Sequence, residues 1–295
     1  MPSVEKDPEA GTGLDPRLAR LLADAERRWG RGALIRLGDA LRSEQEVIPT
    51  GFPALDDALG IGGLPCGRIS EIFGPDSSGK HALAAHLVVQ CQRDEGIAAY
   101  IDLDGQLDPE QMEVAGVDPA SMLLVRPMSH LQGMEVAIRL ARSGGIRLMI
   151  MDLVMGLRLS NISRQPLALM GPSLGLALRR LVSAVDKNGI AFVFLADRPT
   201  GSGARPSMGS QALRFFASVR LGMERREWIR RGRDVVGCRS LVQVVKNKLA
   251  PPLREAEVDL LFYRFPPLAP AIRLCRPSPA AADIFRYRDV GYAGA

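Results

Sequence analysis

The stretch GPDSSGKHAL, residues 74–83, constrains the fold of this 295-residue chain more than any other feature. It matches the pattern G-x-x-x-x-G-K, in which a glycine-rich turn directs backbone N–H groups at phosphate oxygens and the lysine adds a positive charge. The apolar run RISEIF precedes it, and a helical pattern from Lys80 to Arg93 follows it. Because this motif requires a buried strand before it and a helix after it, we expect a phosphate-binding α/β core.

The residue after the lysine departs from this pattern. Ser or Thr normally stands there, because its hydroxyl holds Mg²⁺ against the phosphates, but this chain has His81. Imidazole is a poor ligand for Mg²⁺, which prefers oxygen donors in a tight octahedral geometry. We therefore expect weakened metal binding, no required cofactor, and at most weak binding of ATP or ADP. The candidate nucleotide-binding residues are Gly74, Pro75, Asp76, Ser77, Ser78, Gly79, Lys80, His81 and Asp152.

Strand-like and helix-like segments alternate after this loop. Strands are predicted at residues 68–73, 97–104, 121–127, 146–153 and 190–197, with helices at 80–93, 131–144 and 174–189. Such alternation predicts a mostly parallel sheet covered by helices on both faces. From about residue 211, strand-like runs without long helices predict antiparallel strands that extend the same sheet. Asp152 closes the apolar strand LMIMD, where an acid can orient Mg²⁺ through water.

The remaining sequence suggests four segments. Residues 1–13 are expected to be disordered, and residues 265–295 form an irregular tail rich in Pro and Arg. Between them we expect a helix-and-strand segment at 14–47 and the main core at 48–264. The helix, at residues 15–29, carries an apolar stripe that must pack against a core or another subunit. A short strand is predicted at residues 33–37.

Charge and cysteine content narrow the class of protein. The net charge of the chain is +5. Five arginines lie in the run MERREWIRRGRD, residues 223–234. This run predicts either a solvated face or a surface that contacts DNA or a partner protein. The four cysteines match no metal-ligand spacing, so we expect free thiols in a reducing cytoplasm. No apolar run approaches the ~20 residues that span a bilayer, and the N-terminus is polar. We therefore expect no membrane association and a cytoplasmic, nucleoid-associated protein.

Several segments together resemble the bacterial RecA recombinase family. They include TGFPALDDALGIGGLPCGRISEIFGPDSSGK, YIDLDGQLDP, LARSGGIRLMIMD and VVGCRSLVQVVKNKLAPP. The similarity runs in order from about residue 15 to residue 263. It implies a RecA-type core, an N-terminal helix that docks on the neighbouring subunit, and an ancestral filament that exchanges DNA strands.

The resemblance also defines four departures in the nucleotide site. RecA proteins carry Thr where this chain has His81, and a water-activating Glu where it has Asp104. They carry an adenine-stacking Tyr at the position of Gln111 and a γ-phosphate-sensing Gln at the position of Asp197. Asp104 and Asp197 are therefore the degenerate catalytic-base and sensor positions. A carboxylate that faces a phosphate repels it, and each departure weakens a different part of ATP turnover.

The DNA-binding loops of RecA should correspond to residues 158–171 and 198–209. The basic residues Arg164, Arg198 and Arg205 remain there as candidate contacts for single-stranded DNA. From the resemblance we expect no counterpart of the C-terminal domain that helps RecA gather duplex DNA.

The positions that form the subunit interface in RecA are better retained in this sequence than those of the nucleotide site. Leu18 and Leu22 lie on the apolar stripe of the N-terminal helix. Phe215 matches an aromatic residue that RecA buries between protomers, and Lys246 and Lys248 match lysines that reach a neighbour's γ-phosphate. The alternative for the two lysines is a solvated pair on a strand.

These departures favour an accessory protein over an enzyme. Within the RecA relatives, the size and the degenerate site are similar to the ImuA-type proteins of mutagenic translesion synthesis. That similarity implies a role in the SOS response to DNA damage. The implied partners are the RecA filament, an ImuB-type relative of Y-family polymerases and an error-prone polymerase, with single-stranded DNA as a further ligand. Two alternatives remain open: an active DNA-dependent ATPase or recombinase, and a RecA-fold regulator of cell division or of a recombination mediator.

Overall fold

The computed structural model describes residues 15–30, 33–34, 45–103, 105–153, 172–197 and 208–262. The chain divides into two units, Met1–Gln45 and Glu46–Ala295. The second unit thus begins two residues before the core start expected from the sequence, because β1 (Val47–Ile48) pairs with β2 (Leu64–Pro65) inside it. The predicted tail at 265–295 lies outside the described residues.

The first unit contains the predicted N-terminal helix, α1 (Pro16–Trp29). The Asp15 side chain caps its start by accepting a hydrogen bond of 2.8 Å from the backbone N–H of Arg17, and the helix ends at Gly30. Ala33 and Leu34 lie in a bend, and the rest of the strand predicted at residues 33–37 lies outside the described residues.

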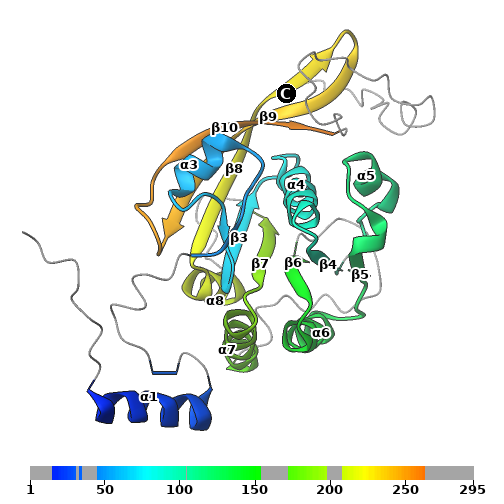
Figure 1. Ribbon diagram of the computed structural model, residues 1–295. Helices are drawn as coiled ribbons and strands as arrows, with labels where there is room; N and C mark the ends of the chain where they lie inside the picture. Colours follow the sequence, from blue (N-terminus) through cyan, green and yellow to red (C-terminus); the bar gives the residue numbers. More distant parts are fainter. Residues whose placement is uncertain are drawn as a thin grey trace, which may run out of the picture. The chain divides into compact units, whose positions relative to one another are not determined.

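The second unit is built on an eight-stranded sheet with the strand order β10-β9-β8-β3-β7-β6-β4-β5 (Figure 1). Its parallel part comprises β3 (Arg68–Gly74), β4 (Ile97–Asp102), β5 (Met122–Val125), β6 (Ile146–Asp152) and β7 (Ala191–Asp197). Three helices connect these strands, namely α4 (Lys80–Arg93), α6 (His130–Ser143) and α7 (Pro172–Lys187). The predicted parallel sheet with helices on both faces is confirmed.

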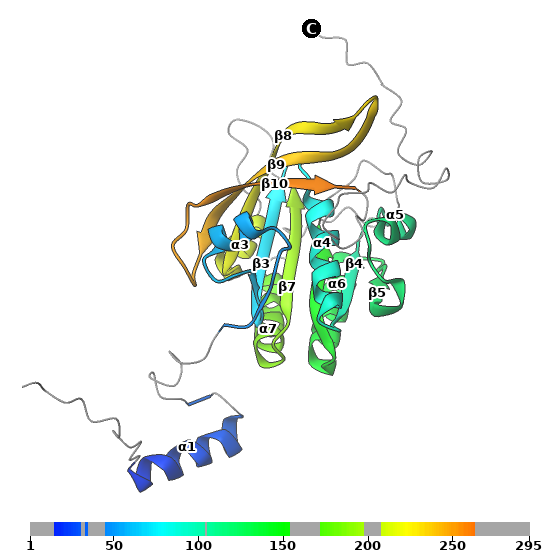
Figure 2. The same cartoon turned by 45° about the horizontal axis from the view of Figure 1, so that its top comes forward.

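The antiparallel extension is confirmed as well. Strand β8 (Val219–Arg231) runs parallel to β3, and β9 (Asp234–Asn247) and β10 (Glu255–Leu261) follow it as an antiparallel series. Strands β8 and β9 continue beyond the other strands as a two-stranded hairpin, which Figure 2 shows from a second angle. The arginine-rich run 223–234 lies on this hairpin.

Short helices complete the unit, and two of them were not predicted from the sequence. α3 (Pro53–Leu59) was expected as a short helical piece, whereas α5 (Pro109–Val114) and α8 (Met208–Phe216) were not predicted. Both missed helices are too short for the repeat of apolar positions to stand out in the sequence.

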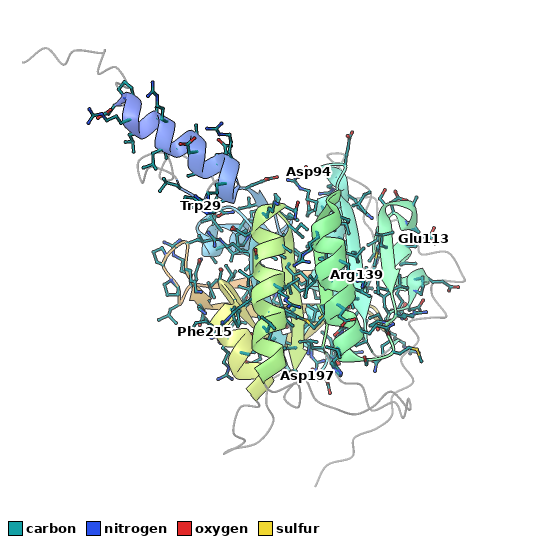
Figure 3. The ribbon with its side chains drawn as sticks, turned by 90° about the horizontal axis from the view of Figure 1, so that it is seen from below. Trp29, Asp94, Glu113, Arg139, Asp197 and Phe215 are labelled. Carbon is teal, nitrogen blue, oxygen red and sulfur yellow. The ribbon has the colours of Figure 1, made fainter. Side chains whose placement is uncertain are left out.

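Apolar side chains cover both faces of the sheet. One buried cluster lies between the sheet and the helices α3 and α4, and a second lies beneath α6, α7 and α8. Figure 3 shows α6 and α7 side by side on this second face. Because β6 and β7 are buried on both faces, they read in the sequence as nearly unbroken apolar runs.

Among the described residues, no helix has both the length and the apolar character needed to cross a membrane. The described cysteines Cys66, Cys91 and Cys238 are buried, and none of these three forms a disulfide. Burial raises the pKa of the Cys66 and Cys91 thiols to about 11, so both are neutral near pH 7. No group of three His, Cys, Asp or Glu side chains gathers as a metal site in the described parts of the chain.

Candidate phosphate-binding site

The phosphate loop connects β3 to α4 and is held in its shape by left-handed backbone positions. Ser77 has φ +57° and Gly79 has φ +91°, a region that costs least for glycine. A Cβ at Gly79 would collide with Cδ1 of Leu260 and lie only 3.1 Å from Oγ of Ser240. Position 79 therefore accepts glycine alone, and α4 begins directly after it with its first N–H groups free to meet an anion.

Lys80 is the buried cation of this loop. Its side chain is 2% exposed, and Nζ donates to the carbonyl oxygens of Gly74 at 2.7 Å and Pro75 at 3.1 Å. Nζ also lies 3.1 Å from Oδ1 of Asp197, with which it forms an ion pair. Asp197 ends β7, directly opposite Gly74 at the end of β3, and is labelled in Figure 3. The loop lysine is thus neutralised by a carboxylate of the same chain.

His81 and Asp152 form the second polar contact of the site. Nε2 of His81 lies 2.8 Å from Oδ2 of Asp152, which ends β6. The hydroxyl of Tyr100 donates to the same carboxylate oxygen at 2.9 Å. Burial, and then the neighbouring Asp152 carboxylate, raises the pKa of Tyr100 well above its ordinary value, so the phenol stays protonated. The acid expected to orient Mg²⁺ is therefore engaged by an imidazole and a phenol.

The antiparallel strands hold the loop from outside. Oγ of Ser240, on β9, donates to the carbonyl oxygen of Ser78 at 2.9 Å, and Nη1 of Arg225, on β8, lies 3.3 Å from the carbonyl oxygen of Ser77. The Arg225 guanidinium stacks on the ring of Trp228 at 3.9 Å. In a trans peptide the N–H points opposite to the carbonyl oxygen. Fixing the Ser78 carbonyl outward consequently turns the next N–H toward the inside of the loop.

Comparison with known proteins agrees with a fold built around this phosphate loop. Residues 17–264 match the family model of the RecA N-terminal domain. The chain belongs to the RecA family. It is 41% identical over 251 residues to Protein RecA of Mycobacteroides abscessus, which covers 82% of this chain and 72% of that protein.

Other RecA relatives show the same level of similarity. Protein RecA of Streptomyces ambofaciens is 39% identical over 263 residues, covering 86% of this chain and 71% of that protein. Protein RecA of Acidothermus cellulolyticus is 41% identical over 255 residues, covering 83% of this chain and 74% of that protein. The RecA-like α/β fold expected from the sequence is therefore shown by the family match and by the strand order together.

Four residues that the RecA resemblance singles out, Asp104, Arg164, Arg198 and Arg205, lie outside the described residues. The catalytic-base position and the DNA contacts therefore stay predictions. Gln111, at the position of the adenine-stacking Tyr in RecA, lies exposed on α5.

Three of the predicted interface residues, Phe215, Lys246 and Lys248, lie close together at the C-terminal end of α8. Phe215, near the end of α8, is 73% exposed, and Lys248 is exposed directly after β9. Nζ of Lys246 instead donates to the backbone carbonyl oxygens of Arg214 at 2.5 Å and Phe215 at 3.3 Å. Lys246 thus caps the C-terminus of α8, where a cation is favourable. On α1, Leu18 is exposed and Leu22 is half-buried.

Three contacts of the site went unnoticed in the sequence: those of Tyr100, Arg225 and Ser240. A signal existed for Tyr100 alone. It stands two residues before Asp102, which ends β4, so both side chains lie on the same face of the sheet. Asp102 is the register partner of Asp152 at the end of β6. No signal pointed to Arg225 or Ser240, because both reach the loop through a strand order that the sequence does not state.

Proposed function

We propose that this chain is a RecA-family accessory protein of the ImuA type, which turns over little or no ATP and acts by binding partners. The observation that carries this proposal is the contact of 2.8 Å between Nε2 of His81 and Oδ2 of Asp152. The histidine stands where RecA proteins carry the Mg²⁺-binding hydroxyl, and it is paired with the acid that would orient the metal. The hydroxyl that would bind Mg²⁺ is thus replaced by an imidazole, and the acid that would orient the metal is paired with that imidazole.

The pairing of Lys80 with Asp197 supports the same proposal. In an active phosphate-loop enzyme the lysine is available to the β- and γ-phosphates, whereas here Nζ is 3.1 Å from a carboxylate. An incoming triphosphate must displace this carboxylate and then face its negative charge. Binding of ATP is therefore expected to be weak.

The proposed partners are the RecA filament, an ImuB-type relative of Y-family polymerases, and an error-prone polymerase. Support for a docking role comes from Phe215, an aromatic side chain left 73% exposed on α8 with its backbone carbonyl held by Lys246. Large exposed aromatic residues are common at the centres of protein interfaces. Docking onto the end of a RecA filament would restrain strand exchange, and Arg164, Arg198 and Arg205 would contact single-stranded DNA.

Purified protein tests this proposal in two assays. We expect no ATP hydrolysis above that of the Lys80→Ala variant, with or without single-stranded DNA and Mg²⁺. We also expect the protein to bind a RecA filament and to lower the rate of RecA strand exchange, and Phe215→Ala to weaken that binding about tenfold or more. DNA-stimulated hydrolysis that disappears in Lys80→Ala would contradict the proposal.

An active DNA-dependent ATPase is the second candidate. It is favoured by the retained phosphate loop with a buried lysine and by identities near 40% to proteins named RecA. The hydrolysis assay separates the two candidates, because only the second requires turnover.

A further inference from the structure

The ion pair between Lys80 and Asp197 places a negative charge at one side of the phosphate loop. Lys80 is buried and directs Nζ at two loop carbonyl oxygens and at Oδ1 of Asp197, 3.1 Å away. The Asp197 side chain is 37% exposed, so it borders the solvent side of the lysine. A group that approaches Lys80 from this side meets the Asp197 carboxylate.

A second observation is a buried hydroxyl in the loop that has no hydrogen-bond partner among the described residues. Ser78 is 1% exposed, and its Oγ has no hydrogen-bond partner among the described residues. The oxygen lies beside Gly74, the first residue of the loop, because a Cβ at Gly74 would come within 2.8 Å of it. Buried hydroxyls in proteins are nearly always hydrogen-bonded, and those that are not call for an explanation such as a missing ligand. A phosphate oxygen next to the first N–H groups of α4 would satisfy this hydroxyl.

From these two observations we propose that, in the absence of Mg²⁺, the loop binds a nucleoside diphosphate more tightly than a nucleoside triphosphate. Asp197 is the residue that sets this preference. The inference rests on the proposed function in one respect, namely that His81 and Asp152 leave no working metal position.

The preference follows from where charge can be accommodated. The terminal phosphate of a diphosphate can use the N–H groups at the start of α4, the Ser78 hydroxyl and one side of Lys80, while Asp197 stays in place. A further phosphoryl group extends toward the lysine and the carboxylate beside it, where like charges repel in a partly buried setting. In an ordinary phosphate-loop site Mg²⁺ neutralises part of that charge, but here His81 and Asp152 are paired with each other.

Isothermal titration calorimetry on the full chain, in buffer with EDTA, tests the inference with ADP and ATP as probes. We expect ADP to bind at least tenfold more tightly than ATP. Asp197→Asn should raise the affinity for ATP at least tenfold and change that for ADP less than threefold. Pyrophosphate and tripolyphosphate should show the same difference, because the selection acts on the phosphate chain. Asp197→Gln provides a second neutral variant in case Asp197→Asn does not fold.

A matched control is Asp186→Asn, which removes an exposed carboxylate that precedes β7, whereas Asp197 ends that strand. It should leave both affinities unchanged. Equal affinities for ADP and ATP in the unaltered chain, a neutral variant that gains no ATP affinity, or no binding of either probe would overturn the inference. None of these results touches the proposed accessory function, which fails only if DNA-stimulated hydrolysis or an absence of RecA binding is found.

Discussion

The imidazole of His81 and the carboxylate of Asp152 are 2.8 Å apart, although 71 positions separate them in the chain. They meet because β6 ends beside the helix that follows the phosphate loop. In a phosphate-loop ATPase this place belongs to Mg²⁺ and its water ligands. Here a side chain supplies the partner of the acid.

Replacing His81 by Thr should restore part of the metal site. The hydroxyl offers an oxygen ligand and releases Asp152 from the imidazole, so ATP affinity should become Mg²⁺-dependent and rise about tenfold in the presence of the metal. Calorimetry with and without Mg²⁺ measures this. His81→Ala is the control, because it frees Asp152 without supplying an oxygen. The idea fails if both variants respond equally to the metal.

Removing the Tyr100 hydroxyl should destabilise the fold. Tyr100→Phe leaves a buried acceptor on Asp152 with one donor fewer, which costs about 1–3 kcal/mol. The free energy of unfolding from urea titrations measures the loss. In a double-mutant cycle, Asp152→Asn should couple to Tyr100→Phe by at least about 0.5 kcal/mol; strict additivity would show that the bond contributes nothing.

Tyr100 should also shape stability at alkaline pH. Its folded-state pKa lies well above the ordinary value of 10.0, first through burial and then through the Asp152 charge. A group whose pKa is raised by folding stabilises the protein below its unfolded pKa, and that stability is lost as the pH rises. The free energy of unfolding should therefore fall above pH 10, and more steeply than in Tyr100→Phe. Parallel pH profiles for the two proteins would be inconsistent with this assignment.

Capping of α8 by Lys246 predicts a modest but specific effect. Lys246→Met removes the donor to the carbonyl oxygens of Arg214 and Phe215, and we expect a loss of about 1 kcal/mol in unfolding free energy. Lys248→Met is the matched control, because its side chain is exposed two positions away. A similar loss in both variants would argue against the cap.

The clamp from β9 onto the loop predicts that Ser240→Ala weakens both the fold and anion binding. Losing the donor to the Ser78 carbonyl should cost about 1 kcal/mol, and pyrophosphate affinity should fall several-fold, because the next N–H is no longer oriented. Gln243→Ala on the same strand removes only an exposed hydrogen bond to Glu255 and should change neither quantity. Unaltered pyrophosphate binding in Ser240→Ala would show that the loop keeps its shape unaided.

Much of the fold was predictable because its signals are local. Unbroken apolar runs indicated β6 and β7, capping residues indicated both ends of α1, and glycine at position 144 indicated the end of α6. The two missed helices, α5 and α8, have only six and nine residues, so each shows too few turns for a helical repeat to be recognised. Tertiary contacts determine such segments, and these contacts are invisible in a local window.

For the candidate site, the sequence by itself determined the phosphate loop, its family, and the substitutions His81 and Asp197, because each is visible as a residue type at a fixed distance from the motif. Only the tertiary structure decided what these side chains contact. The pairing of His81 with Asp152 and of Lys80 with Asp197 depends on which strands end side by side, and the support from Ser240 depends on β9 lying beyond β8 in the same sheet. Contacts between residues so far apart in the chain follow from strand order and register, which a linear sequence does not display.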